Sequence, residues 1–265
     1  MHPITSRQNP IVARFRAIAE APDPTGARVL LDGVHLVRDA QDSGLTFEVV
    51  AVAASRMAEH TEEGLLARAL SSSGIEIVET SDSVFAALSP VKTPSGIAAI
   101  ATRRPAKAAD ICAPPQALVV AAVDIQDPGN VGALMRVAEA GGVTGMFVCG
   151  TSANPFSWKA VRGSMGSVLR LPVVGGMTTA AALTTMKQSG LRTVATIARG
   201  GTDPDTFDWN GKVGILLGSE GAGLSEDVIA SCDARVSIPM APVVDSLNVA
   251  TAGAILVYAA RRQRR

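Results

Sequence analysis

Aromatic residues are scarce in this chain of 265 residues, and neither sign of charge dominates it. Phe, Trp and Tyr together make up 3% of the sequence, so small aliphatic residues must form most of the core. Lys and Arg number 24, as do Asp and Glu, which gives a formal net charge of zero. A basic field over the whole molecule is therefore excluded, and any surface that binds nucleic acid must be a local patch.

Cysteine is also rare. Cys112, Cys149 and Cys232 are odd in number, far apart and without the spacing of a metal site, so we expect free thiols. The N-terminus lacks the charged-then-apolar pattern of a signal peptide, and no apolar run is long enough to span a bilayer. These absences predict a soluble, cytoplasmic protein that holds no metal and does not contact a membrane.

Two nucleotide-binding signatures are missing as well. No segment completes the Gly-x-Gly-x-x-Gly fingerprint of dinucleotide-binding domains, and a Walker-type lysine is absent. The Gly-Ala-Gly loop at 221–223 follows a predicted strand but does not extend to that fingerprint. A dinucleotide-dependent oxidoreductase is therefore a remote alternative.

The pattern of residues 1–103 predicts a small α/β domain. Short strands and helices alternate there, which indicates a compact α/β sandwich. We expect strands at 28–31, 47–53, 75–78 and 97–102, and helices at 34–40, 62–71 and 81–88. Residues 104–116 are rich in proline and alanine without a clear period, and we interpret them as a linker.

Residues 117–265 show the pattern of a parallel α/β sheet. Segments 117–123 and 213–217 are continuous apolar runs, which are typical of strands buried on both faces. We further expect strands at 145–149, 171–174, 192–197 and 235–238, and helices at 130–140, 155–168, 178–189, 225–231 and 250–260. The carboxyl ends of parallel strands meet at one edge of a sheet, so we expect the functional site there.

Three loops that follow predicted strands carry polar residues and glycines, and indicate one shared pocket. They read Asn-x-Gly-x-x-x-Arg at 130–136, Gly-Ser-Glu-Gly-Ala-Gly-Leu-Ser at 218–225, and Ile-Pro-Met followed by Ser-Leu-Asn-Val at 238–249. Closely spaced glycines allow a backbone to wrap a flat ligand.

Each motif alone has a simpler structural explanation. Asn130 and Ser246 are both suitable N-caps for the helices that follow them. Glu220 can serve only to favour a helix N-terminus, and Arg136 can be a solvated side chain. Asn248, in the first turn of the last helix, is less well explained in structural terms.

Taken together, the three motifs resemble those of the SpoU (TrmH-type) RNA ribose methyltransferases, which belong to the SPOUT class. Upstream, the segments at 6–10, 31–33 and 91–96 resemble the N-terminal substrate-binding domain of the two-domain members, which is similar to a small RNA-binding ribosomal protein. The resemblance covers almost the whole chain. Asp32 stands where Glu is usual, and Ala250 where Ser is common.

The resemblance implies a fold, a cofactor and an assembly. The C-terminal domain is expected to carry a deep trefoil knot, a topology that is otherwise very rare, and the knot is expected to bind S-adenosylmethionine. A homodimer through the knot helices is implied, and a two-fold dimer is the commonest oligomer. The expected cofactor-binding residues are Thr196, Gly218, Glu220, Ile238, Met240, Ser246 and Leu247.

The implied reaction moves a sulfonium methyl group to a ribose 2′-hydroxyl, a weak nucleophile that must lose its proton. The implied catalytic residues are Asn130, Arg136, Glu220, Ser246 and Asn248. A guanidinium stays protonated up to a pH of about 12. We therefore expect Arg136 to stabilise the developing alkoxide and to orient the ribose-phosphate, with Asn130 positioning Arg136 or the ribose.

Contacts to RNA are expected from both domains: Arg162, Ser164 and Lys159 in the C-terminal domain, and Arg7 and Lys92 in the N-terminal domain. Each of the charged residues can equally be a solvated surface side chain. The C-terminal run Arg-Arg-Gln-Arg-Arg at 261–265 can bind phosphate. We interpret it as a solubilising tail at a helix C-terminus, where cations are favoured.

Ribosomal RNA of the large subunit is the favoured substrate, because the N-terminal domain resembles those of members that act on ribosomal RNA and of the thiostrepton-resistance type. Transfer RNA is the alternative within the class. A non-catalytic RNA-binding or assembly protein with the same fold is the alternative outside it, and the intact Arg136, Glu220, Ser246 and Asn248 argue against that alternative.

Overall fold

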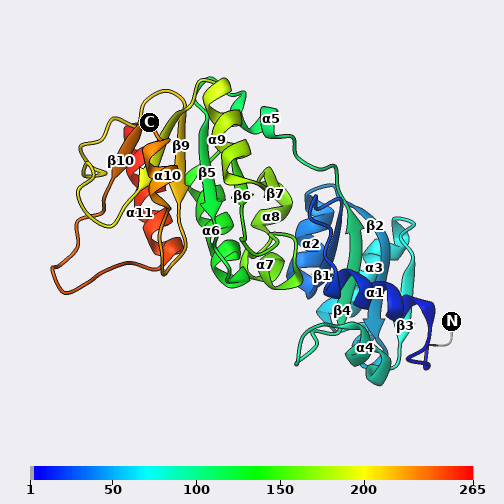
Figure 1. The fold of residues 1–265 in the computed structure, drawn as a ribbon. Helices are drawn as coiled ribbons and strands as arrows, with labels where there is room; N and C mark the ends of the chain where they lie inside the picture. The colour runs from blue at the N-terminus through cyan, green and yellow to red at the C-terminus, as the bar shows by residue number, and fades with distance from the viewer. Residues whose placement is uncertain (1–2, 265) are drawn as a thin grey trace.

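The structure is a computed structural model that describes residues 3–264. It contains two α/β units, each built on its own sheet (Figure 1). The N-terminal unit ends with β4 (Ile97–Thr102), and the chain then crosses to the C-terminal unit, where the second sheet begins with β5 (Leu118–Val123).

The N-terminal unit is a four-stranded mixed sheet with helices on both faces. Its strand order is β1-β4-β2-β3, with β1 and β2 antiparallel to β4 and β3 parallel to β2. The elements are β1 (Arg28–Asp32), β2 (Thr46–Ala53), β3 (Ile77–Thr80), α1 (Pro10–Glu20), α2 (Val34–Asp42), α3 (Glu62–Ser72) and α4 (Asp82–Leu88). Alternate residues of β1 face opposite layers, so Leu31 packs with α2 and α3 while Leu30 packs with α1 and α4.

The C-terminal unit is a six-stranded sheet in which every pair is parallel, as the sequence predicts. The strand order is β10-β8-β9-β5-β6-β7. The strands are β6 (Gly145–Cys149), β7 (Val173–Met177), β8 (Arg192–Thr196), β9 (Val213–Leu217) and β10 (Ala234–Val236). The helices are α5 (Ala108–Cys112), α6 (Pro128–Gly141), α7 (Trp158–Gly163), α8 (Ser167–Arg170), α9 (Thr179–Gln188), α10 (Glu226–Ala230) and α11 (Val249–Gln263).

The two faces of this sheet are covered by different helices. Val120 and Ala122 of the central strand β5 share a buried cluster with α6, α7 and α11, whereas Val119 and Ala121 share another with α5, α9 and α10. The carboxyl ends of β8, β9 and β10 carry the loops that hold the site. The trefoil knot implied by the family resemblance stays a prediction.

Two of the helix caps differ from the prediction. The N-cap of α6 is Asp127, whose carboxylate accepts from the backbone N–H of Asn130 at 2.8 Å. The N-cap of α11 is Asn248, whose Oδ1 accepts from the N–H groups of Ala250 and Thr251. The expected caps Asn130 and Ser246 are therefore wrong, and both side chains are available for other contacts.

Two segments are divided differently from the prediction. The single helix expected at 155–168 is two short helices, α7 and α8, separated by Met165, whose φ of 49° lies outside the right-handed helical region. The segment 104–116, expected as a linker, contains the helix α5, and its residues Ile111 and Cys112 are buried in the C-terminal unit. The other expected elements lie within a few residues of their predicted places.

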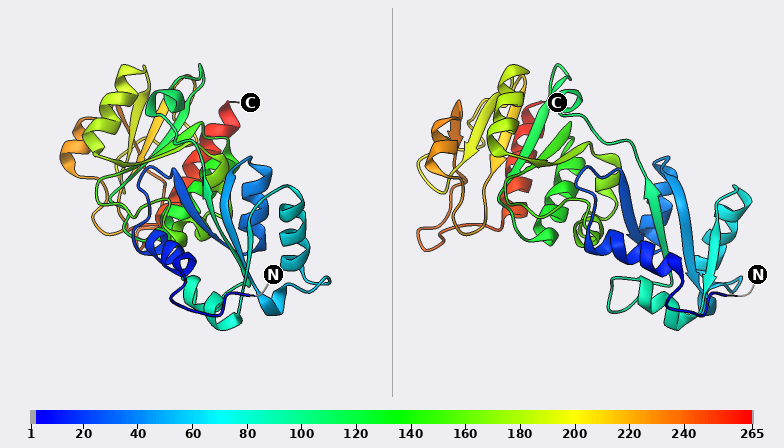
Figure 2. Two further views of the ribbon diagram at one scale, coloured as in Figure 1. Left: turned by 90° about the vertical axis from the view of Figure 1, so that its right-hand side faces the viewer. Right: turned by 45° about the vertical axis from the view of Figure 1, so that its right-hand side comes forward.

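The two units share a packed junction (Figure 2). Phe156, just before α7, is buried and lies against Gly26 of the N-terminal unit. The Arg103 guanidinium lies 5.2 Å from the centre of the Phe156 ring and donates to the Val168 carbonyl at 2.8 Å. The Asn154 amide donates to the Pro22 carbonyl at 2.9 Å. These contacts join the two units into one continuous core.

Candidate active site

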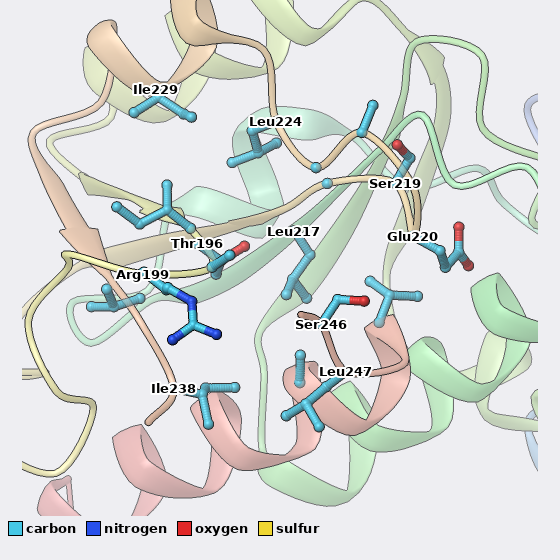
Figure 3. Close-up of a pocket in the computed structure, with 18 of the residues that line it drawn as sticks. Thr196, Arg199, Leu217, Ser219, Glu220, Leu224, Ile229, Ile238, Ser246 and Leu247 are labelled. Atoms are coloured by element: carbon cyan, nitrogen blue, oxygen red, sulfur yellow. The ribbon is translucent and has the colours of Figure 1, made fainter. Parts of the chain in front are cut away.

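A cavity of about 470 Å³ lies at the carboxyl edge of the C-terminal sheet (Figure 3). Its walls come from the ends of β8, β9 and β10, from the loop at 218–224, and from the segment that leads into α11. The volume lies within the range of about 300–1,000 Å³ that is usual for small-molecule sites. This is the edge at which a parallel α/β sheet binds ligands.

All the predicted cofactor-binding residues line this one cavity. They are Thr196 after β8, Gly218 and Glu220 after β9, Ile238 and Met240 after β10, and Ser246 and Leu247 before α11. The sequence motifs therefore identify a cavity whose parts are separated by up to about fifty residues along the chain.

The walls combine apolar side chains with exposed backbone. Leu217, Leu224 and Ile229 form one side, and Ile238 and Leu247 the other. Such walls suit a flat organic ring, which is held by dispersion contacts over its whole face.

The loop after β9 folds back tightly on itself. The backbone of Ser219 pairs with that of Gly223, and a Cβ added to Gly218 would lie 2.2 Å from the carbonyl carbon of Gly223. Only glycine at position 218 allows the two backbone segments to approach this closely. The turn leaves Glu220 at its exposed end, next to the start of α6.

A chain of hydrogen bonds connects the three motifs beside the cavity. The Asn248 Nδ2 donates to the Asn130 Oδ1 at 3.0 Å, and the Asn130 Nδ2 donates to the Glu220 Oε1 at 2.5 Å. The direction of these bonds is fixed at the α11 end, because backbone N–H groups can only donate to the Asn248 Oδ1. Asn248 must therefore present its amide nitrogen to Asn130, which must in turn present its own to the Glu220 carboxylate.

This chain explains two residues that the sequence alone did not. Asn248 caps α11 and orients Asn130 at the same time. Asn130, freed from capping by Asp127, connects α11 to the loop after β9. Ser246 lines the cavity instead of capping the helix.

Arg136 lies apart from this cluster. It is exposed on α6, six residues after Asn130, which on an α-helix is a rotation of about 240° and a rise of about 9 Å. Both ends of the Asn130 amide are already bound to Asn248 and Glu220. Among residues 3–264 no hydrogen bond joins Asn130 to Arg136, so the expectation that Asn130 positions Arg136 or the ribose stays a prediction.

The predicted RNA contacts differ in accessibility. Arg7, Lys92, Lys159 and Arg162 are exposed. Ser164 is fully buried, and its hydroxyl donates to the Val161 carbonyl at 2.7 Å, so it shapes the turn between α7 and α8 and does not reach RNA.

Arg162 stands beside the N-terminal unit. Burial raises the pKa of Asp32, whereas hydrogen bonds from Ser89 and Ser95 and the nearby charge of Arg162 act to lower this pKa. The same hydroxyl groups attach the loop that carries Lys92 to the end of β1. Arg162 and this loop therefore border the same junction between the units.

The arginines of the C-terminal run bind to the chain itself. Arg261 donates to the Ala140 carbonyl, Arg262 pairs with Asp205, and Arg264 donates to the carbonyls of Trp209 and Gln116. Arg265, the last residue of the run, lies outside the described residues. These contacts support the interpretation that the run does not serve RNA binding.

The cysteines match the expectation from the sequence. All three are free, and Cys112 and Cys149 are buried. Burial and the negative charge of Asp124 raise the pKa of the Cys149 thiol to about 12. Within residues 3–264, no three His, Cys, Asp or Glu side chains are grouped so that they could hold a metal ion. No helix in the same range is long and apolar enough to cross a membrane.

The fold defines a methyltransferase of the SPOUT class, and its cavity lies at the carboxyl edge of the parallel sheet. The chain belongs to the SpoU rRNA Methylase family, whose model matches residues 117–258. Residues 25–99 match the model of the MRM3-like substrate binding domain. The resemblance read from the sequence motifs is confirmed.

Full-length relatives agree with this assignment. An uncharacterised tRNA/rRNA methyltransferase of Synechocystis sp. is 32% identical over 268 residues, which cover 98% of this chain and 94% of the relative. The 23S rRNA (guanosine(2553)-2′-O)-methyltransferase RlmP of Bacillus subtilis is 28% identical, with coverage of 97% and 98%. The SpoU methyltransferase AviRb of Streptomyces viridochromogenes, solved in complex with AdoMet, is 27% identical, with a TM-score of 0.86 and coverage of 97% and 98%.

Proposed function

We propose that this enzyme transfers the methyl group of S-adenosylmethionine to a ribose 2′-hydroxyl of large-subunit ribosomal RNA. The observation that carries the proposal is the hydrogen-bonded chain from Asn248 through Asn130 to Glu220, at the edge of a cavity lined by the whole predicted cofactor set. RlmP, which is similar over nearly its entire length and is named for 2′-O-methylation of 23S rRNA, supports the choice of substrate.

The residues of the cavity fit S-adenosylmethionine. The leucine and isoleucine walls suit its adenine ring, and the backbone of the loop after β9 is exposed to the ligand because of its glycines. When bound, the cofactor supplies an electrophilic methyl group on a cationic sulfur. The Glu220 carboxylate, held by Asn130, adds negative charge at that side of the cavity.

Side chains of the protein fix and stabilise the groups that react. Asn130 and Asn248 each make hydrogen bonds that leave little freedom to rotate, so the Glu220 side of the cavity is preorganised before RNA arrives. Arg136 stabilises negative charge on the ribose oxygen as it attacks and orients the neighbouring phosphate. Its permanently charged guanidinium makes it a poor base, so the 2′-hydroxyl proton leaves to water or phosphate.

Arg136 reaches a reacting ribose through a homodimer. The exposed residues Thr251, Ile255, Tyr258 and Arg262 follow one face of α11, at intervals of four, three and four. Ile255 and Tyr258 are 38% and 43% exposed, and together they form an apolar patch on this face of the helix. Arg136 lies on α6, which packs against α11, so pairing of these faces in two copies brings it toward the partner's cavity. Light scattering that gave a monomer mass at micromolar concentration would contradict this arrangement.

RNA is held across the junction of the units. Arg162 and the loop of Lys92 border it from the two sides, and Lys159 lies on the same short helix as Arg162. Phosphate contacts from separate domains fix the register of an RNA substrate, while the site reads the ribose.

A methylation assay tests the proposal. The purified protein is incubated with labelled S-adenosylmethionine and, separately, with unmodified 23S rRNA, 16S rRNA and transfer RNA. Nuclease digestion and mass spectrometry should then find a 2′-O-methylated nucleoside in 23S rRNA only. The Arg136→Ala variant should bind the cofactor normally but lose at least about 100-fold in turnover, as when one charge-stabilising group is removed.

Each other result of this assay has a definite meaning. Methylation of transfer RNA alone would show that the substrate is transfer RNA and not ribosomal RNA. A base-methylated nucleoside would show that the methyl group goes to a base and not to the ribose. A folded dimer that binds cofactor but modifies none of the three RNAs would favour a non-catalytic RNA-binding role. Full activity of Arg136→Ala would remove the role of that residue.

A further inference from the structure

Arg199, in the loop after β8, is held in a fixed orientation at the wall of the cavity. Its Nη2 donates to the carbonyl oxygens of Pro242 and Val244, both at 3.2 Å. Both acceptors lie in the loop between β10 and α11, which forms another wall of the same cavity. A guanidinium is rigid and planar, so the two bonds at Nη2 restrict the direction of the remaining nitrogens.

The remaining N–H groups of this guanidinium are available to a ligand. Among residues 3–264, its Nε and Nη1 make no hydrogen bond. In Figure 3 the guanidinium faces the cavity in the space near Thr196 and Ile238. Each of these N–H groups carries the charge of the guanidinium and can make a charge-assisted hydrogen bond to a carboxylate or phosphate oxygen.

The charges around the cavity limit what this arginine can bind. The charged residues of the lining are Arg199, Arg235, Glu220, Glu226 and Asp245. S-adenosylmethionine carries two cationic groups, the sulfonium and the ammonium, and one anionic group, the α-carboxylate of its methionine part. The acidic side chains can face the cations, and the two arginines are the cationic side chains of the lining that can face the carboxylate.

Arg199 is better prepared for this contact than Arg235. Arg235 is an exposed residue of β10, the edge strand of the sheet, and no side-chain hydrogen bond holds it within the described part of the chain. Binding through Arg235 would have to order a long free side chain, which costs about 0.5–1.5 kcal/mol. The Arg199 side chain is already partly ordered by its hydrogen bonds to Pro242 and Val244, so less order has to be gained when the ligand binds.

We propose that Arg199 binds the α-carboxylate of S-adenosylmethionine and so determines the preference of this enzyme for a ligand with an intact methionine part. The inference rests on the cavity being the cofactor site, as proposed above. It makes Arg199 a cofactor-binding residue that none of the three sequence motifs includes.

Two ligands distinguish a contact of Arg199 with the carboxylate from a role of Arg199 in holding the loop between β10 and α11. S-adenosylhomocysteine keeps the amino-acid part of the cofactor, whereas 5′-methylthioadenosine keeps the adenosine and the sulfur but has no carboxylate. Titration calorimetry with both ligands is made on the wild type and on Arg199→Ala, Arg199→Lys and Arg235→Ala. The binding of 5′-methylthioadenosine also shows whether each variant keeps an intact pocket.

Arg199→Ala is expected to weaken the binding of S-adenosylhomocysteine by about 10- to 100-fold, the usual effect of removing a charge-assisted hydrogen bond. Its affinity for 5′-methylthioadenosine should equal that of the wild type. The ammonium group of S-adenosylhomocysteine cannot be the cause of this pattern. Arg199→Ala removes a cation, and removal of a nearby cation would strengthen the binding of an ammonium. Arg199→Lys should be intermediate for S-adenosylhomocysteine, and Arg235→Ala should affect neither ligand.

Several results would overturn the inference. An equal loss of affinity for both ligands in Arg199→Ala would show that the residue acts only by holding the loop between β10 and α11 in place. If only Arg235→Ala selectively loses affinity for S-adenosylhomocysteine, the carboxylate is bound by Arg235 of β10 and not by Arg199. A folded wild type that binds neither ligand would instead remove the cavity as the cofactor site, and with it the role of Arg199.

Discussion

Asn248 performs two tasks with the two atoms of one amide group. Its Oδ1 caps α11, and its Nδ2 orients Asn130 toward Glu220. Sequence reasoning identified the residue through the family motif but assigned the cap to Ser246. The reason is that both serine and asparagine are good N-caps, and only the structure shows which of the two has the required backbone position.

The two tasks can be separated by substitution. Asn248→Ser keeps a capping oxygen but loses the amide nitrogen, so it should unfold at nearly the wild-type temperature and yet methylate RNA at least about 10-fold more slowly, as for a lost positioning contact. Asn248→Ala should lose the activity and also about 0.5–2 kcal/mol of stability, the usual cost of an absent N-cap. Thermal unfolding and single-turnover methylation measure the two effects.

The matched control is Ser246→Ala, which removes the cap expected from the sequence. It should leave the unfolding temperature unchanged, because Ser246 does not cap α11 in the structure. A fully active Asn248→Ser would show that the bond from Asn248 to Asn130 is not needed for the reaction.

At the scale of elements, the position of α11 depends on one close contact with α6 and β9. A Cβ added to Gly253 would lie 2.4 Å from the Cδ1 of Leu134 and 3.3 Å from the Cδ1 of Leu217. The atoms it would meet are ends of side chains, which can move by a small distance. A methyl group can therefore be accommodated at this position, and a branched side chain cannot.

Gly253→Val should destabilise the protein by about 1–3 kcal/mol, as is usual for overpacking. Displacement of α11 should also weaken the binding of S-adenosylhomocysteine, because Leu247 just before this helix and Val249 at its start lie on the cavity wall. Gly253→Ala should be close to neutral, since the better helix propensity of alanine offsets the crowding. Denaturant unfolding and calorimetry measure both effects.

The control for this pair is Thr184→Val, at an exposed position of α9 that is neither in the cavity lining nor on the proposed dimer face. It adds no crowding, so stability and cofactor affinity should both stay at wild-type values. Unchanged stability in Gly253→Val would mean that the contact between α6 and α11 is looser than the structure shows.

The elements themselves were largely predictable, with informative exceptions. Continuous apolar runs such as 118–123 identify strands without regard to the rest of the fold. The break between α7 and α8 was missed, because it depends on the backbone of Met165 and on buried Ser164, which the apolar pattern does not reveal. The helix α5 was missed because five residues are too few to show a period.

At the scale of the whole molecule, the sequence did not reveal that the two units share a core. The contact of Phe156 with Gly26 joins residues 130 positions apart, and no local pattern marks it. Because of this shared core, removal of residues 1–105 would also disturb the C-terminal unit. Such a deletion would expose the Phe156 ring and take away the Arg103 donor of the Val168 carbonyl, so it would not leave an undisturbed catalytic domain.

Phe156→Ala is therefore the more selective test of what the junction does. Loss of this fully buried ring should cost about 3–5 kcal/mol, as is usual for Phe→Ala in a core. The affinity for S-adenosylhomocysteine should stay unchanged, because the cavity lies at the other end of the C-terminal unit. RNA binding should weaken at temperatures where the variant is folded, because Arg162 and the loop of Lys92 are no longer held in register.

The matched control is Phe85→Ala, which removes an equally buried ring from the N-terminal unit, on the face of its sheet that packs with α1 and α4. Its loss of stability should be similar, but its RNA affinity in the folded state should match that of the wild type. If Phe156→Ala and Phe85→Ala lower RNA affinity equally, the junction has no specific role in holding RNA. If only Phe156→Ala does so, the shared core is what sets the phosphate contacts of one unit at a fixed distance from those of the other.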